Sequence, residues 1–246
     1  MRSRKQKQLG VGNSFDLSIS DLMAALCCIF ILFLVFTIRK LNVEREDFKK
    51  KNAVATEYRL NQQALYGALY SEFSQDLIKW NAELKLENGT ILIRFKIPKD
   101  SRDKKDKIMF LPDQYEIQGN FKNYFDDFFP RYVSILRKQE FKEKIEEIRI
   151  EGHTARDNKH LYKVDYEEGI ELSQKRTKEV MIYCLDTLSD EDRTWVQGKL
   201  AAIGYSFSRP MYEGSDINWD ISRRVEFSIR TKADSVITEM ENTRVN

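Results

Sequence analysis

Glycine and proline are scarce in this sequence, which has 10 and 4 of them among 246 residues. Neither occurs between Gly12 and Gly67. Glycine weakens a helix and proline breaks one, so nothing in this stretch interrupts a helix that starts near Asp16. At 1.5 Å per residue, a continuous helix from Asp21 to Tyr66 would be about 70 Å long.

An excess of one charge is also missing. Lys and Arg number 41 against 39 Asp and Glu, which leaves a formal net charge of +2. Proteins that bind nucleic acid directly usually need a clear basic excess to meet the phosphates. We therefore expect no direct nucleic-acid partner. Charged residues still make up 33% of the chain, a value typical of a soluble protein.

Cysteine and histidine are rare, with three and two residues. Cys27 and Cys28 lie in an apolar run and Cys184 is alone in the remainder, so no disulfide can form within the C-terminal part. No thiol pair accompanies His153 or His160, which argues against a zinc or other histidine-based metal site. His153 is expected to be a hydrogen-bonded residue at a strand end. Phosphate loops, nucleophile elbows and dinucleotide fingerprints are absent, so we expect no enzyme.

The longest uncharged run extends from Leu22 to Ile38 and contains 17 residues, the lower end of a membrane-spanning length. A secretory signal peptide is the competing interpretation, because basic residues precede the run. However, the run is longer than a normal signal core and leads into Arg39 without a cleavage site, which favours a retained transmembrane helix. Basic residues lie on both sides of the run and do not decide its orientation.

Asp21 lies at the border of this run. A carboxylate costs about 2.5–3.5 kcal/mol near the centre of a bilayer and less near its edge, so its presence needs a reason. One helical stripe of small or polar side chains is formed by Ser18, Asp21, Ala25 and Cys28. Such a stripe lets another helix come close, and a carboxylate facing it can take up and release an ion. The alternative is that Asp21 caps the N-terminus of the helix.

Beyond the run, apolar residues return at helical spacing in Leu65, Leu69, Phe73, Leu77 and Trp80. This spacing predicts a linker helix whose stripe packs on its own domain or on a second copy of the chain. Expected strands are residues 90–97, 147–151 and 224–229, and expected helices are residues 124–136 and 170–188. Strands that alternate with helices imply an α/β sandwich, so the fold class is α+β with an N-terminal transmembrane helix.

Residues 18–26 (SISDLMAAL) resemble the start of the span in the MotB stator proteins. In that family an aspartate is followed by an apolar residue, Met and small residues, and the aspartate carries a proton or a sodium ion. The resemblance implies that Asp21 is the ion-translocating residue. The other members of the stripe, Ser18, Ala25 and Cys28, are then expected to support the helix interface. No bound cofactor is expected, and the only small species involved is the transported H⁺ or Na⁺.

The C-terminal half resembles the OmpA-like peptidoglycan-binding domain. The matching segments occur in the family's order and are residues 148–154 (IRIEGHT), 171–176 (ELSQKR), 204–210 (GYSFSRP) and 223–227 (RRVEF). This resemblance implies the family's β-α-β fold in an OmpA-like α/β sandwich.

The OmpA-like resemblance also implies a peptidoglycan site. Its candidate residues here are Arg176, Asp157, Thr154, Arg223 and Arg224. Family members usually have an aspartate after Gly-His-Thr that contacts diaminopimelate, whereas this chain has Ala155 there and Asp157 two residues later. A zwitterionic amino-acid ligand needs an acceptor and a cation that face each other, and Arg176 is the family's cation.

Together these features resemble the MotB-type subunit of a rotary ion-driven motor, and most closely the MotB-like subunits of Zorya anti-phage defence systems. The resemblance implies a single-pass protein of the bacterial inner membrane with a cytoplasmic N-terminus and a periplasmic C-terminal domain. It further implies a homodimer inside a ring of MotA-like (ZorA-type) multi-span subunits, anchored to peptidoglycan. A flagellar or other MotB-like stator and a passive wall tether without ion transport are the alternatives.

The domain organisation expected from these patterns has five segments. They are a short cytoplasmic tail (1–20), the transmembrane helix (21–40), a periplasmic linker helix (41–83), the OmpA-like domain (84–232) and a C-terminal tail (233–246).

Overall fold

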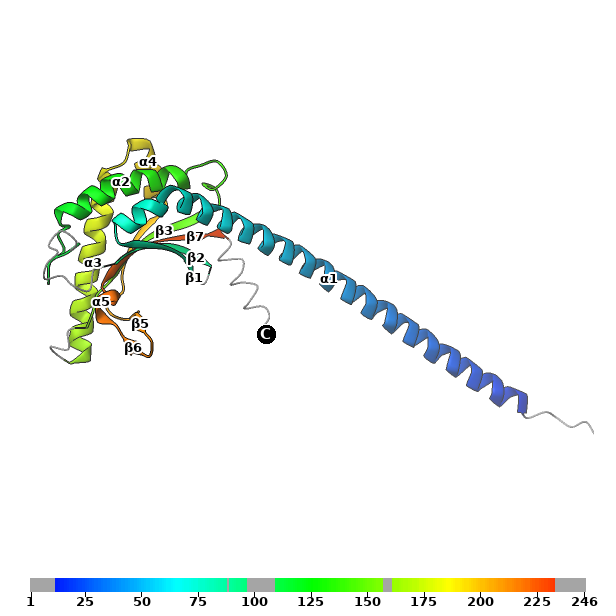
Figure 1. Ribbon diagram of the computed structural model, residues 1–246. Helices are drawn as coiled ribbons and strands as arrows, with labels where there is room; N and C mark the ends of the chain where they lie inside the picture. Colours follow the sequence, from blue (N-terminus) through cyan, green and yellow to red (C-terminus); the bar gives the residue numbers. More distant parts are fainter. Residues whose placement is uncertain (1–11, 88, 97–108, 157–160, 233–246) are drawn as a thin grey trace, which may run out of the picture. The chain divides into compact units, whose positions relative to one another are not determined.

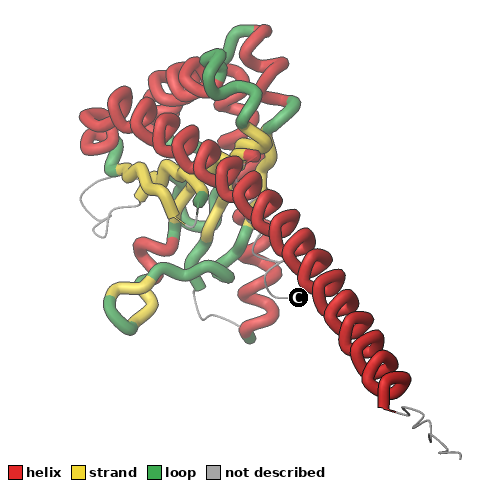
Figure 2. Tube along the Cα trace, turned by 90° about the vertical axis from the view of Figure 1, so that its right-hand side faces the viewer, coloured by secondary structure: helices red, strands yellow, loops and turns green. Residues whose placement is uncertain are grey.

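The computed structural model describes residues 12–87, 89–96, 109–156 and 161–232, with side chains from residue 21 onward (Figure 1). The chain divides into two compact units, Met1–Val54 and Ala55–Asn246. Helix α1 (Gly12–Lys79) has 68 residues and contributes to both units. Figure 2 shows it as one uninterrupted helix, as the lack of glycine and proline predicts.

The first unit contains the N-terminal part of α1. The large apolar side chains of this part are exposed, among them Leu22 (72%), Ile29 (64%) and Phe36 (69%). By length and composition, the helix within Asp21–Lys79 is apolar enough to cross a membrane. The single N-terminal apolar helix expected from the sequence is therefore confirmed. It begins at Gly12, inside the segment 1–20 that the sequence assigned to a tail.

The second unit is built on a five-stranded sheet with the order β1-β2-β7-β3-β4. These strands are β1 (Ala82–Glu87), β2 (Thr90–Lys96), β3 (Ile145–His153), β4 (Leu200–Gly204) and β7 (Arg224–Thr231). Strands β3 and β4 are parallel, and the other neighbours are antiparallel. A separate two-stranded hairpin is formed by β5 (Tyr212–Glu213) and β6 (Asp216–Ile217).

The remaining helices are α2 (Gly119–Leu136), α3 (Tyr162–Asp186), α4 (Asp190–Gln197) and α5 (Trp219–Ser222). Figure 1 shows α2 and the last turns of α1 lying along one face of the sheet. Helix α3 packs closely on β3 and β4 because both strands have glycine at the contact. A Cβ atom added at Gly204 would lie 2.5 Å from the Ser173 hydroxyl, and one at Gly152 would lie 2.6 Å from Thr177.

The apolar stripe at the end of α1 lies in the core of this second unit. Its members Leu65, Leu69, Phe73, Leu77 and Trp80 are all buried. The rings of Trp80 and Phe128 have centroids 5.8 Å apart, and those of Phe128 and Phe227 are 5.0 Å apart. The sequence left open whether this stripe packs on its own domain or on a second copy of the chain. The structure shows that it packs on its own domain.

The compact domain therefore starts at Ala55, earlier than the boundary at residue 84 that the sequence suggested. Helical periodicity marks an apolar face and does not show where that face docks. A polar contact reinforces the packing, because Arg131 of α2 donates from Nε to Glu72 (2.7 Å) and from Nη1 to Asp76 (2.9 Å), both on α1.

Every strand and helix expected from the sequence pattern is present, and the mixed α/β domain is confirmed. Helices α2 and α3 start earlier than expected, at Gly119 and Tyr162 in place of residues 124 and 170. Strand β2 is described up to Lys96, and residue 97 lies outside the described residues, as does the expected tail 233–246.

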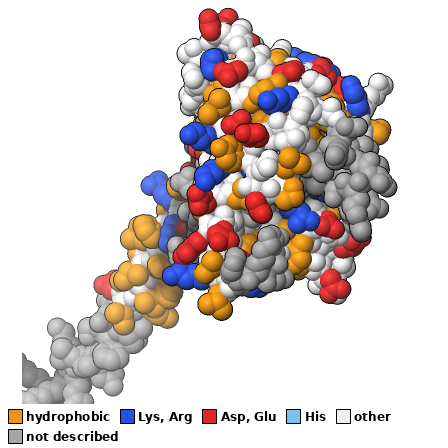
Figure 3. Space-filling model, turned by 90° about the vertical axis from the view of Figure 1, so that its left-hand side faces the viewer, with side chains coloured by type: hydrophobic (Ala, Val, Ile, Leu, Met, Phe, Trp, Pro, Cys, Tyr) orange, Lys and Arg blue, Asp and Glu red, His pale blue; other side chains and the backbone are white. Residues whose placement is uncertain are grey.

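The surface of the domain carries both signs of charge. Figure 3 shows Lys and Arg side chains interspersed with Asp and Glu on the face that it presents. Many are paired along one helix, as Lys175 is with Glu171 and Lys163 with Glu167. The face in view thus has no region of a single charge sign, in keeping with the near-equal numbers of basic (41) and acidic (39) residues in the chain.

Candidate functional site

Asp21 lies within α1, about two and a half turns after the helix begins at Gly12. An N-cap residue flanks the first turn of a helix, so Asp21 does not cap α1. This excludes the alternative interpretation of Asp21 as a helix cap. Asp21, Ala25 and Cys28 are exposed and recur at helical spacing on one face. Ser18 belongs to the helical stretch, and its side chain lies outside the described part of the chain.

The candidate wall-binding residues come from three elements of the second unit. Thr154 follows strand β3, Arg176 lies on α3, and Arg224 begins β7. A cavity of about 10 Å³, room for about one water, lies between these elements. Its lining residues are Met109, Phe110, Gly152, His153, Ser173, Arg176, Arg224 and Val225. The acidic candidate, Asp157, lies outside the described residues.

Arg176 is half-buried and makes two hydrogen bonds to the backbone of the segment before α2. Its Nε donates to the carbonyl oxygen of Gln114 (2.8 Å) and its Nη2 to that of Leu111 (3.1 Å). The guanidinium carbon lies 4.9 Å from the ring centroid of Phe110. Burial lowers the pKa of Arg176 to about 10, against the opposing effect of the Asp113 carboxylate. The cation is present at neutral pH, and one edge of it is occupied.

Thr154 and Ala155 directly follow strand β3, where the sequence predicted the start of the ligand-binding loop. The backbone N–H of Thr154 donates to the carbonyl of Ser206 (2.9 Å), which ties this loop to the end of β4. The Thr154 hydroxyl is buried and has no hydrogen-bond partner among the described residues. Arg156 donates to Asp165 at 3.1 Å. The ligand acceptor expected at this loop therefore depends on Asp157.

The two arginines before the last strand have different environments. Arg223 is partly exposed and pairs with Asp220 on α5. Arg224 is buried, and its donors go to Glu226 (Nε, 2.5 Å) and to the carbonyls of Ser222 (2.9 Å) and Arg209 (3.2 Å). Three donors of Arg224 are thus used within the fold, which makes it a structural residue more than a ligand-binding one.

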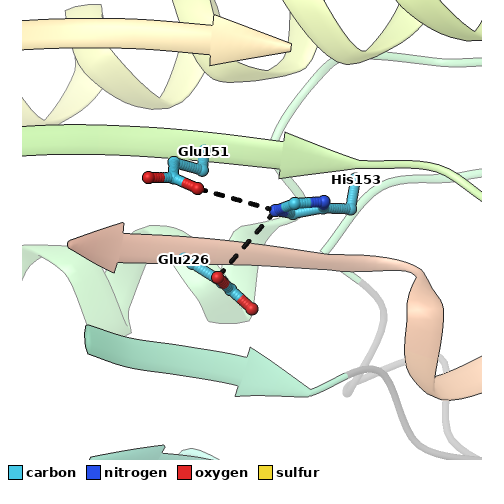
Figure 4. A group of neighbouring side chains, drawn as sticks. All are labelled: Glu151, His153 and Glu226. Atoms are coloured by element: carbon cyan, nitrogen blue, oxygen red, sulfur yellow. Dashed lines mark ion pairs between the residues drawn. The ribbon is translucent and has the colours of Figure 1, made fainter. Parts of the chain in front are cut away.

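A buried polar cluster lies on the sheet beside this site (Figure 4). The Nε2 atom of His153 is 3.9 Å from a carboxylate oxygen of Glu226 and 4.0 Å from one of Glu151. The His153 ring stacks on Tyr205 with centroids 5.2 Å apart. Burial lowers the pKa of His153 to about 3, and the Arg224 guanidinium acts in the same direction. His153 is therefore neutral at physiological pH.

The sequence predicted a hydrogen-bonded histidine at a strand end, and the structure agrees only on the position. Both ring nitrogens of His153 lack a hydrogen-bond partner within the described part of the chain. The cluster itself was not foreseen, because Glu151 and Glu226 lie on strands separated by a long stretch of sequence and face each other only through the register of β3 and β7.

The spacing of Glu151, His153 and Glu226 would allow a metal ion, since one ligand atom of each lies within 4.8 Å of the others. The charges around them argue against one. Glu226 accepts from Arg94 Nε (2.6 Å) as well as from Arg224 Nε (2.5 Å). A dication would lie among guanidinium groups that already neutralise the carboxylates, in a buried site where uncompensated charge is costly. The cluster is best described as an internally neutralised ion-pair network.

Comparisons with known proteins agree with this architecture. No family model matches the chain. A solved structure of a putative MotB like protein from Desulfovibrio vulgaris matches with a TM-score of 0.50 and 18% identity, covering 73% of this chain and 99% of that one. The periplasmic domain of Helicobacter pylori MotB matches with a TM-score of 0.41 and 18% identity, covering 67% and 92%.

The first of these likenesses shows a MotB-like fold for the second unit. In sequence, the Zorya protein ZorB of Escherichia coli (Crooks strain) is 35% identical over 234 residues, which cover 93% of this chain and 92% of that protein. Similarity at this level along almost the whole of both chains shows common family membership. The chain belongs to the ZorB family of Zorya proteins.

Proposed function

We propose that this protein is the MotB-like subunit of an ion-driven stator in the bacterial inner membrane, and that the motor serves Zorya anti-phage defence. The observation that carries the proposal is the position of Asp21. It lies inside an uninterrupted helix, at the border of the apolar run, where it has no capping role. Membership of the ZorB family supports the assignment to Zorya.

In the proposed mechanism Asp21 takes up and releases H⁺ or Na⁺. Ala25 and Cys28 follow Asp21 on the same face, and Ser18 precedes it, so a second helix can approach the carboxylate closely. Ion binding neutralises the carboxylate and release restores its charge, which alters the contacts with surrounding helices. Two copies of the chain inside a ring of MotA-like subunits would use their aspartates alternately, because neighbouring like charges disfavour simultaneous ionisation.

The second unit would hold the dimer to peptidoglycan from the periplasmic side, with the short N-terminus in the cytoplasm. Arg176 is the proposed contact for a carboxylate of diaminopimelate, since a guanidinium binds a carboxylate through two parallel hydrogen bonds. Asp157 is the proposed acceptor for the ligand's ammonium group, and Thr154 and Arg223 are further proposed contacts. The protein does no covalent chemistry in this proposal.

Purification of the full-length chain from native membranes tests this assignment. We expect a multi-span MotA-like protein to copurify with this chain. Each complex should contain two copies of this chain and more than two copies of the MotA-like protein. The Asp21→Asn variant should assemble in the same way, because the amide is nearly isosteric with the carboxylate. A passive wall tether would instead be recovered without a multi-span partner.

A further inference from the structure

One edge of the Arg176 guanidinium already holds two oxygen atoms of the same chain. Nε and Nη2 lie side by side on one edge of the guanidinium, and they donate to the carbonyls of Gln114 (2.8 Å) and Leu111 (3.1 Å). Two parallel donors facing two oxygens is the arrangement with which arginine binds a carboxylate. The two backbone carbonyls therefore take the place of a bound carboxylate.

The segment that supplies these carbonyls is tied down at both ends and exposed in the middle. Met109, Phe110 and Ile117 are buried, with 1%, 7% and 4% of their surface exposed. The N–H of Gln118 donates to the carbonyl of Met109 at 3.0 Å, which closes residues 109–118 into a loop. Residues 111–116 are exposed. The middle of this loop can leave Arg176 without disturbing the buried ends.

The space beside Arg176 agrees with an occupied site. The cavity that Arg176 lines with Phe110 measures about 10 Å³, which admits about one water and no amino-acid side chain. The Phe110 ring, which precedes the exposed part of the loop, lies against the Arg176 guanidinium with its centroid 4.9 Å from the guanidinium carbon. A ligand carboxylate thus finds the Nε–Nη2 edge occupied and too little room in the cavity while the loop is in this position.

We infer that residues 111–114 are an internal plug on the wall-binding arginine, and that peptidoglycan binds only after this loop has moved away from Arg176. The inference rests on the proposed function, in which Arg176 contacts the ligand. The ligand then replaces two hydrogen bonds from the Arg176 cation to neutral carbonyls with two hydrogen bonds from the same cation to an anionic carboxylate, which are stronger. Its apparent affinity is reduced by the fraction of molecules in which the loop is open.

Substitution of Phe110 tests the plug in the purified full-length chain with diaminopimelate-type sacculi. Phe110→Ala removes the ring that holds the loop against Arg176, and we expect retention on sacculi to rise several-fold. Phe141→Ala is the matched control, because it truncates a similarly buried phenylalanine (4% exposed) that lines a different cavity. Retention of that variant should equal the wild-type value. Equal retention of all three proteins would overturn the plug.

Amide hydrogen exchange of the wild-type chain supplies a second measurement that needs no variant. The N–H of Gln114 donates to the carbonyl of Leu111 at 3.1 Å, and that of Gln118 to Met109. A muropeptide containing meso-diaminopimelate should speed exchange at Gln114 when it binds. Binding with unchanged or slower exchange across residues 109–118 would overturn the plug and leave the wall-anchor function standing. Failure of both wild type and Phe110→Ala to bind sacculi or muropeptide would overturn both.

Discussion

Arg94 and Glu226 face each other across strands β2 and β7, and the Arg94 Nε donates to the Glu226 carboxylate at 2.6 Å. Both side chains are buried, with 5% and 7% exposed. Glu226 in turn is the register partner of Glu151 on β3, so the ion pair leads directly to the cluster around His153. On the face of the sheet opposite the aromatic core, buried side chains therefore form ion pairs, whereas buried faces of sheets usually carry apolar side chains.

Loss of Arg94 should destabilise the domain strongly. Arg94→Ala leaves buried Glu226 with one guanidinium fewer, and breaking a buried pair in this way costs about 3–5 kcal/mol. Urea unfolding of the full-length chain in detergent, followed by the fluorescence of the buried Trp80, measures the change. Lys96→Ala is the control, since Lys96 is 37% exposed where it pairs with Glu83, and its loss should cost at most about 1 kcal/mol. Equal costs would contradict the buried-pair account.

His153 should make the domain less stable as the pH falls from about 6.5 toward 3. The pKa of His153 is lowered to about 3, so in this range the unfolded chain binds a proton that the folded chain does not. Stability is then complete above the unfolded pKa and declines below it, by at most about 1.4 kcal/mol per pH unit.

Urea midpoints at pH 7.5 and 5.0 measure this effect, in a range above the ordinary pKa of carboxyl groups. The wild-type midpoint should fall between the two conditions. In His153→Gln, which has no titrating group at this position, the fall should be smaller. The same fall in both proteins would show that His153 is not the group responsible.

Arg176→Ala should weaken retention on sacculi, because it removes the proposed contact for the ligand carboxylate. Pull-down of the full-length chain with isolated sacculi measures this directly, and we expect a loss of about tenfold or more for a charge-assisted pair. Arg193→Ala is the matched control, since Arg193 is a partly exposed arginine paired with Asp186 on the α3–α4 side of the domain. Unchanged retention of Arg176→Ala would rule out this arginine as the anchor.

The elements that the sequence predicted correctly are ones that local patterns carry, although the alternating segment of β1 (Ala82–Glu87) was not expected as a strand. The apolar helix follows from an uncharged run without glycine or proline, and β2 follows from alternation after Asn-Gly. Strand β4 (Leu200–Gly204) has only five residues and no alternation, so no periodic signal marked it. Helix α3 was expected too short because its first turns contain few apolar residues.

Local sequence patterns could not predict contacts between residues that are far apart in the chain. The carbonyls that bind Arg176 belong to Leu111 and Gln114, more than 60 residues earlier in the chain, and backbone atoms leave no trace in side-chain motifs. The motif predicted that Arg176 is the cation of a ligand site, and only the fold shows that its Nε–Nη2 edge is occupied by backbone carbonyls. Sequence patterns likewise could not tell whether Asp21 caps a helix, since that depends on where the helix begins.

Anti-phage protection by the Asp21→Asn variant tests whether the Asp21 carboxylate is the ion carrier of the motor. The variant would be expressed from its native locus with the neighbouring genes, and plaque formation would be compared with that on wild-type cells. Glu44→Gln is the control, because it neutralises an exposed carboxylate of α1 beyond the apolar run. The account predicts that wild type and Glu44→Gln protect the cells, whereas Asp21→Asn assembles normally and gives no protection. Full protection by Asp21→Asn would contradict the account.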